Sequence, residues 1–178
     1  MRGLHCTAAA GAAAVFTMSA CAPALDWREV RPAGSQLRAM FPCKPASHAR
    51  RVSLAQSTVE MSLYACSAGD LSYAIAFADL ADPARVGPAL DELGRALATN
   101  VQAAGAAASS PLQVAGMTPS EHAAAWRVEG RLPDGRAVQE RAALFAYGTR
   151  VYQATVVGPR LSDEEALANF FDGLRVQP

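Results

Sequence analysis

Apolar and polar residues alternate along much of this chain, which is the pattern of β-strands that bury one face. The clearest stretch is 58–66, where Val59, Met61, Leu63 and Ala65 alternate with more polar neighbours. The same reading predicts strands over residues 36–41, 49–54, 58–66, 70–80, 124–132, 135–147 and 150–157, with shorter strands at 111–115 and 174–176.

Two segments change to the helical period. From Val86 onward the apolar residues fall at steps of three and four, which predicts an amphipathic helix that begins near Asp82 and Pro83 and ends at Gly105. A second helix is predicted from Ser162 to Gly173, because Ser162 and Glu165 have the spacing of a capping box. Its apolar stripe consists of Leu167, Phe170, Phe171 and Leu174.

Turn signals join most of the strands in sequence. Pro133-Asp134-Gly135 and Gly148-Thr149 are typical of tight turns between neighbouring antiparallel strands. In the strand 70–80, bulky residues alternate with small ones, mostly alanine, which predicts burial on both sides and a helix close to the alanine face. The pattern as a whole indicates an α+β fold in which a mostly antiparallel β-sheet is flanked by two main α-helices.

The first twenty residues differ from the rest. Arg2 precedes an apolar run at 8–20, which has the length of a signal-peptide core and is shorter than the roughly 20 residues that span a bilayer. The run ends in Met18-Ser19-Ala20-Cys21, which resembles a bacterial lipobox. The resemblance implies cleavage before Cys21, a lipid anchor on its thiol, and, with Ala22 next to it, retention at the outer membrane. A secretory signal cut nearby and an uncleaved short anchor are the alternatives.

These features divide the chain into a signal peptide at 1–20, a lipid-anchored tether at 21–35 and a single globular domain at 36–178. Removal of 20 residues leaves 158, enough for one domain with its own core. The mature chain carries 15 basic and 16 acidic residues, so no basic surface is expected and nucleic acid is an unlikely class of partner. The expected location is the periplasmic face of an envelope membrane, in contact with the membrane and with another envelope protein.

Cys43 and Cys66 are the only cysteines of the predicted folded body. In an exported chain such a pair indicates a disulfide, with free thiols or a redox role as alternatives. If the strands 36–41, 49–54 and 58–66 form a meander, the two cysteines are separated by two strand spacings, roughly 9.6 Å. That exceeds the limit of about 7 Å between disulfide Cα atoms. A bridge therefore requires that the first and third strands be neighbours, or that the segment around Cys43 fold across the strand end.

Catalytic patterns are sparse. His48 and His122 are the two histidines of the mature chain, and their spacing matches no metal-ligand motif. We therefore predict no catalytic residue, metal ligand or cofactor, and keep an envelope hydrolase or metal-dependent enzyme using His48 or His122 as the alternative. Glu140 and Arg141 interrupt an otherwise apolar strand, which predicts a wet patch or pairing across the strands with Arg127 or Glu129.

Three motifs together resemble bacterial exported domains of the PsbP and DcrB type: Phe41-Pro42-Cys43-Lys44-Pro45, the run at 148–153 and the ending at 170–176. The resemblance covers residues 36–178. It implies a mostly antiparallel sheet between helices, and an accessory or assembly role without a shared active site. The expected function is therefore non-enzymatic binding of an envelope protein or a small amphiphile, through an exposed apolar patch or groove.

Overall fold

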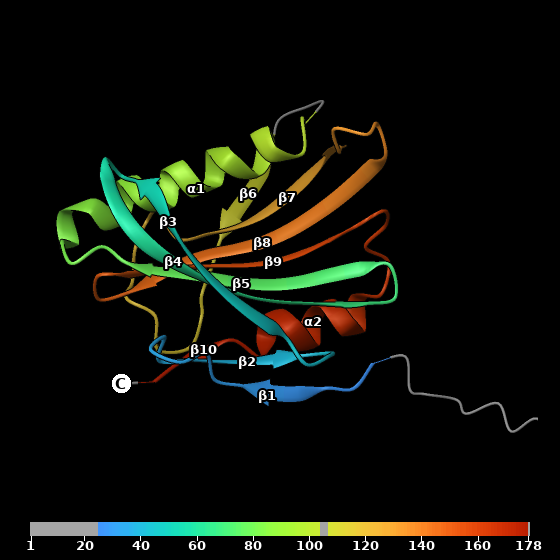
Figure 1. Cartoon of the computed structure of the whole chain (residues 1–178), viewed down its shortest axis with the longest axis horizontal. Helices are drawn as coiled ribbons and strands as arrows, with labels where there is room; N and C mark the ends of the chain where they lie inside the picture. The colour runs from blue at the N-terminus through green and yellow to red at the C-terminus, as the bar shows by residue number, and fades with distance from the viewer. Residues whose placement is uncertain (1–24, 104–106, 178) are drawn as a thin grey trace, which may run out of the picture.

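The computed structural model describes residues 25–103 and 107–177 (Figure 1). The predicted signal peptide and Cys21 lie outside these ranges, as does Gly105. The helical elements are a short 3-10 helix η1 (Pro83–Arg85), α1 (Val86–Asn100) and α2 (Glu164–Asp172).

Two antiparallel sheets make up the strand content of residues 25–103 and 107–177. The larger has seven strands in the order β3 (Ala46–Leu54), β4 (Ser57–Ala68), β5 (Leu71–Asp79), β9 (Arg150–Gly158), β8 (Ala137–Tyr147), β7 (Ala124–Arg131) and β6 (Ala108–Pro111). The smaller has three, in the order β1 (Arg28–Val30), β2 (Leu37–Phe41) and β10 (Arg175–Val176). The predicted α+β fold, with a mostly antiparallel sheet and two helices, is confirmed.

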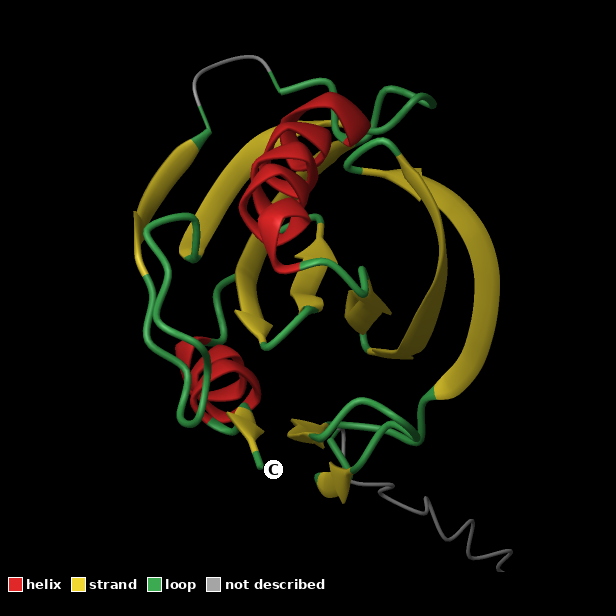
Figure 2. Cartoon of the chain, turned by 90° about the vertical axis from the view of Figure 1, so that its left-hand side faces the viewer, coloured by secondary structure: helices red, strands yellow, loops and turns green. Residues whose placement is uncertain are grey.

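The large sheet curls around α1, whereas α2 and the small sheet lie outside the curve (Figure 2). Alternating side chains therefore enter two different cores. In β8, Leu144 packs in the concave core with α1, and its neighbour Phe145 packs in the convex core with Phe170 of α2. Burial on both faces explains why the central strands are mostly apolar.

The alanine face of β5 does point toward the α1 side, as its alternation predicts. Tyr73, Ile75 and Phe77 belong to the convex core, and Ala78 belongs to the concave core. However, α1 lies over β7, β8 and β9. Ala76 consequently remains only partly buried, and space is left beside the helix.

Several predicted boundaries are wrong by a few residues. Asp163 caps α2 in place of Ser162, because its own carboxylate accepts a hydrogen bond from the Ala166 N–H at 2.9 Å. Helix α1 ends at Asn100, before Gly105. The edge strand β6 occupies Ala108–Pro111 where 111–115 was expected, since it is paired in register with β7.

The N-terminal boundary also differs. Residues assigned by composition to the tether form β1, which pairs with β2, and Trp27 packs edge-on against Tyr73 with ring centroids 6.4 Å apart. The strand expected at 36–41 is β2, and it belongs to the small sheet. The strands expected at 36–41, 49–54 and 58–66 therefore do not form a meander.

The disulfide between Cys43 and Cys66 is present, with its Cα atoms 6.0 Å apart. Of the two arrangements that allow it, the structure adopts the second. The segment between β2 and β3 carries Cys43 across the end of the large sheet to Cys66 on β4. The bridge thus ties the two sheets together where the chain passes from one to the other.

Candidate functional site

An open groove lies on the concave face of the large sheet, between α1 and strands β3 to β5. We call it the concave groove. Its volume is about 500 Å³, within the range of small-ligand sites. Its apolar walls include Val52, Leu54, Met61, Leu63, Ala76 and Leu93, and its polar residues include His48, Arg50, Glu92, Asn100 and Gln153.

The groove follows from one row of directly opposed residues. His48 pairs with Leu63, Leu63 with Ala76, and Ala76 with Gln153 across four adjacent strands. The small side chain of Ala76 leaves space for the groove above this row. Leu63 is 37 % exposed, and within the described ranges it is the one large hydrophobic side chain exposed to this degree.

Arg50 places a positive charge on the outer wall of the groove. His48 and Arg50 line it from β3, where both residues are exposed. The groove's acidic residue, Glu92, already accepts a hydrogen bond from the backbone N–H of Ala55 at 2.8 Å. This bond holds the turn between β3 and β4 against α1 and satisfies part of the Glu92 carboxylate. The groove is therefore apolar with a basic rim.

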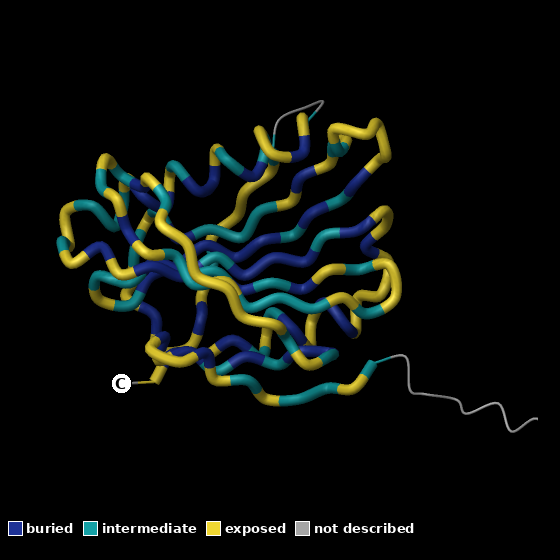
Figure 3. Tube along the Cα trace, in the orientation of Figure 1, coloured by how far each residue is buried: buried dark blue, intermediate teal, exposed yellow. Residues whose placement is uncertain are grey.

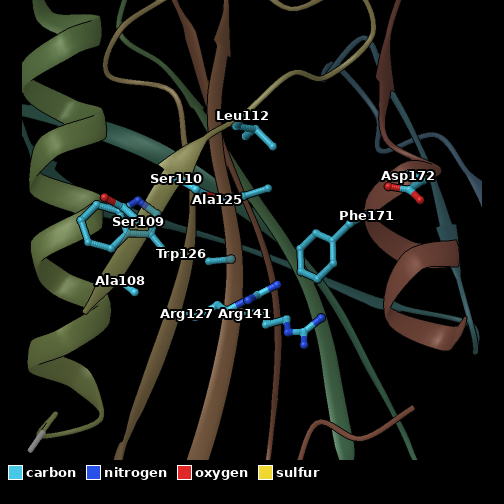
Figure 4. A pocket seen from close by; sticks show the side chains of 12 residues that line it. Ala108, Ser109, Ser110, Leu112, Ala125, Trp126, Arg127, Arg141, Phe171 and Asp172 are labelled. Atoms are coloured by element: carbon cyan, nitrogen blue, oxygen red, sulfur yellow. The ribbon is translucent and has the colours of Figure 1, made fainter. Parts of the chain in front are cut away.

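A second cavity, of about 370 Å³, lies between strands β6 to β8 and α2 (Figure 4). We call it the α2 cavity. Phe171 projects from α2 toward Arg127 and Arg141 on the sheet (Figure 4). These two arginines are directly opposed on β7 and β8. Arg141 donates to both carboxylate oxygens of Glu164, at 2.6 and 2.8 Å, and this pairing lowers the pKa of Glu164.

The pairing predicted for Glu140 and Arg141 is wrong. Arg141 faces α2 and binds Glu164, and Glu129 accepts a hydrogen bond from the Gln139 amide at 3.1 Å. Glu140 points to the concave side and is 7 % exposed, opposite Val128 and Val157.

Glu140 is therefore a buried carboxyl among apolar neighbours. Its burial raises its pKa to about 7. The sequence singles out Glu140 but does not predict its burial. Alternation along β8 places Glu140 on the same face as Val138 and Ala142, but it does not show that this face is covered.

The two predicted histidines occupy separate places. His48 lines the concave groove. His122 lies against the first two turns of α1, where its ring is beside Gly87 and its Nδ1 is 2.9 Å from Oδ1 of Asp91. Ser120 Oγ accepts a hydrogen bond from the His122 backbone N–H at 3.2 Å, so this contact does not involve the imidazole ring. The structure does not assemble His48 with His122.

Within residues 25–103 and 107–177, no three His, Cys, Asp or Glu side chains gather closely enough to hold a metal ion. No helix in the same ranges combines the length and apolar character needed to cross a bilayer.

Sequence comparison adds no family assignment. No protein-family model matches the chain, and no curated protein matches it.

Proposed function

We propose that this protein is an exported bacterial lipoprotein, held to the periplasmic face of an envelope membrane through Cys21, with a non-enzymatic binding or assembly role. The lipobox-like quartet before Cys21 supports the anchor. The Cys43–Cys66 disulfide supports export, because such bonds persist in oxidising compartments such as the periplasm. The outer membrane is favoured by Ala22, the residue after the anchor.

The resemblance to PsbP- and DcrB-type domains agrees with the layers of the fold. A mostly antiparallel sheet carries α1 on one face and α2 on the other (Figure 2). Because function resides in a site and not in a fold, the architecture alone does not assign a role.

The concave groove carries the proposal. Its apolar walls stay open to solvent beside α1, and Leu63 is exposed at its centre. Exposed apolar surface in a concave site commonly marks a place where a ligand or partner binds. We therefore propose that the concave groove binds an apolar part of an envelope component.

A neutral apolar fluorophore, N-phenyl-1-naphthylamine, tests this assignment by fluorescence titration. The wild-type protein is expected to bind it saturably. Leu63→Glu introduces a charge at the groove centre, and Ala76→Leu fills the groove floor. Each substitution is expected to weaken binding roughly tenfold or more, which corresponds to about 1.4 kcal/mol or more.

Leu112→Glu is the matched control, because Leu112 lines the α2 cavity and not the concave groove. It is expected to leave the titration unchanged. Loss of binding in Leu112→Glu with retention in Leu63→Glu would move the site to the α2 cavity and overturn the assignment.

The anchor has its own test. Cys21→Ser is expected to abolish metabolic palmitate labelling and to release the protein from the membrane fraction. Unchanged labelling and fractionation would remove the lipid anchor from the proposal while leaving the groove assignment intact.

A further inference from the structure

The outer wall of the concave groove is also a free sheet edge. Strand β3 pairs with β4 on one side and ends the order of the large sheet on the other. Its first six residues, from Ala46 to Arg51, are all exposed, and they form a continuous exposed tract in Figure 3. An unpaired edge of nine residues presents a row of backbone donors and acceptors to another strand.

The opposite edge of the same sheet is protected. Strand β6 has only four residues and ends at Pro111, which has no N–H to donate. Short strands, prolines and charged side chains are means by which sheet edges avoid pairing. Strand β3 has nine residues and no proline, and its charged residues, Arg50 and Arg51, disfavour only strands of like charge.

Charge selects the kind of strand that fits. Strand β3 contains no acidic residue and carries two arginines, Arg50 and Arg51. In the register of β3 with β4, Arg50 is opposite Met61 and His48 is opposite Leu63. Arg51 is opposite Glu60. Arg50, on the concave side, therefore has no acidic residue opposite it.

A second copy of this chain is a poor occupant. Antiparallel pairing of two β3 strands about their central residue would place Arg50 of one copy directly opposite Arg50 of the other. Like charges directly opposed across strands are destabilising. A strand with acidic residues would make favourable pairs at the same positions.

We propose that β3 receives an extended segment of another protein, rich in acidic and apolar residues, which adds one strand to the large sheet and lays its apolar side chains over the concave groove. This inference rests on the function proposed for the groove and names its occupant. Backbone hydrogen bonds to β3 supply affinity, and the groove and the basic residues supply specificity.

The test uses a fluorescein-labelled peptide of about ten residues in which two Val and two Glu residues repeat, so that each face of the extended strand carries both residue types. Fluorescence anisotropy is expected to show saturable binding, and hydrogen exchange to show slowed exchange of the amides of residues 46–54. A Lys-Val peptide of the same length is expected to bind at least roughly tenfold more weakly. A Glu-Val peptide methylated at alternate backbone nitrogens is expected not to bind, because it cannot complete the ladder.

Arg50→Glu and Arg51→Glu are each expected to weaken Glu-Val binding and to strengthen Lys-Val binding. Arg160→Glu, at an exposed site outside β3, is the matched control and is expected to change neither. Equal binding of both peptides to all variants would overturn the charge argument.

The outcomes separate the two proposals. If the naphthylamine enters the groove but the Glu-Val peptide leaves exchange of 46–54 unchanged, the inferred occupant is wrong and the groove assignment stands. If neither binds, both fail. Binding to phosphatidylglycerol vesicles that depends on Arg50 and Arg51, without peptide binding, would replace the peptide with a membrane surface.

Discussion

Asp79 and Arg150 form an ion pair at the junction of β5 and β9, with Oδ2 and Nη2 3.0 Å apart. The same carboxylate accepts hydrogen bonds from the Thr149 hydroxyl at 2.6 Å and from the Ala81 N–H at 3.0 Å. The other terminal nitrogen of Arg150 donates to the Gln36 amide oxygen at 2.9 Å. The pair therefore connects the large sheet to the segment that enters the small one.

Asp79→Asn is expected to lower the free energy of unfolding at neutral pH by about 1 kcal/mol, a modest value because the side chain is about half exposed. The Thr149 hydrogen bond is the main cause that lowers the pKa of Asp79 in the folded state. A lowered folded pKa gives stability that is present above the unfolded pKa and is lost as pH falls through the folded pKa. Urea unfolding from pH 7 downward should therefore show that the free energies of unfolding of wild type and Asp79→Asn converge.

Asp70→Asn is the matched control for that series, since Asp70 is exposed and takes part in no ion pair within the described ranges. A constant difference between wild type and Asp79→Asn at every pH would contradict the proposed role of the carboxylate charge.

Glu140 is expected to give the opposite pH dependence. Its folded pKa, about 7, lies above the ordinary value of 4.5. Folding therefore favours the protonated form, and this contribution to stability is lost as pH rises from about 4.5 through 7. Glu140→Gln should stabilise the protein at pH 8 by up to a few kcal/mol, at about 1.4 kcal/mol per pKa unit, and have little effect at pH 4.5.

Urea unfolding of Glu140→Gln at the two pH values checks this expectation, with the exposed Glu60→Gln as the control. Destabilisation by Glu140→Gln at pH 8 would mean that the carboxylate is solvated or paired in the folded protein.

The turn between β3 and β4 contains a backbone strain that glycine would relieve. Ala55 and Gln56 have φ values of 47° and 61°, in the left-handed region. Gln56→Gly is expected to raise the free energy of unfolding by about 0.5 to 1 kcal/mol. Roughly 1–2 kcal/mol comes from relief of strain, and roughly 0.4–1 is lost to the greater freedom of glycine in the unfolded chain.

Gly135→Ala provides the converse case. Gly135 has a φ of 84°, and an added Cβ would meet nothing within 4 Å. Any loss in unfolding free energy, expected at about 1 kcal/mol, therefore reports backbone conformation alone. Thermal unfolding is expected to show a higher Tm for Gln56→Gly and a lower Tm for Gly135→Ala. Such opposite shifts would support backbone strain in the turn between β3 and β4.

Local pattern predicted most elements, because each depends on neighbours in sequence. The alternation of Met61 and Leu63 and the turn at Gly135, whose N–H donates to the Leu132 carbonyl at 2.8 Å, required no knowledge of the rest of the chain. The placement of β2 in a second sheet could not be predicted in this way, because it depends on pairing with β10 at the far end of the sequence.

The concave groove was predicted only in kind, as an exposed apolar groove. Its residues follow from where α1 lies on the sheet, over β7 to β9 and beside Ala76, and amphipathic periodicity does not specify that position. Glu140 illustrates the same limit. Its strand was predicted, but its burial depends on packing on both faces of the sheet.

The disulfide gives the last prediction. Cys43 and Cys66 are 23 residues apart, and closing a loop of that size restricts the unfolded chain by about 3 kcal/mol in the chain-entropy model. Cys43→Ala combined with Cys66→Ala is expected to lower the free energy of unfolding by about that amount. The bond also fixes the segment between the two sheets, so amide exchange in β2 should increase more than exchange in β9. Wild-type protein treated with a thiol reductant should match the double variant, and a reductant effect that persists in the double variant would show that the loss arises elsewhere.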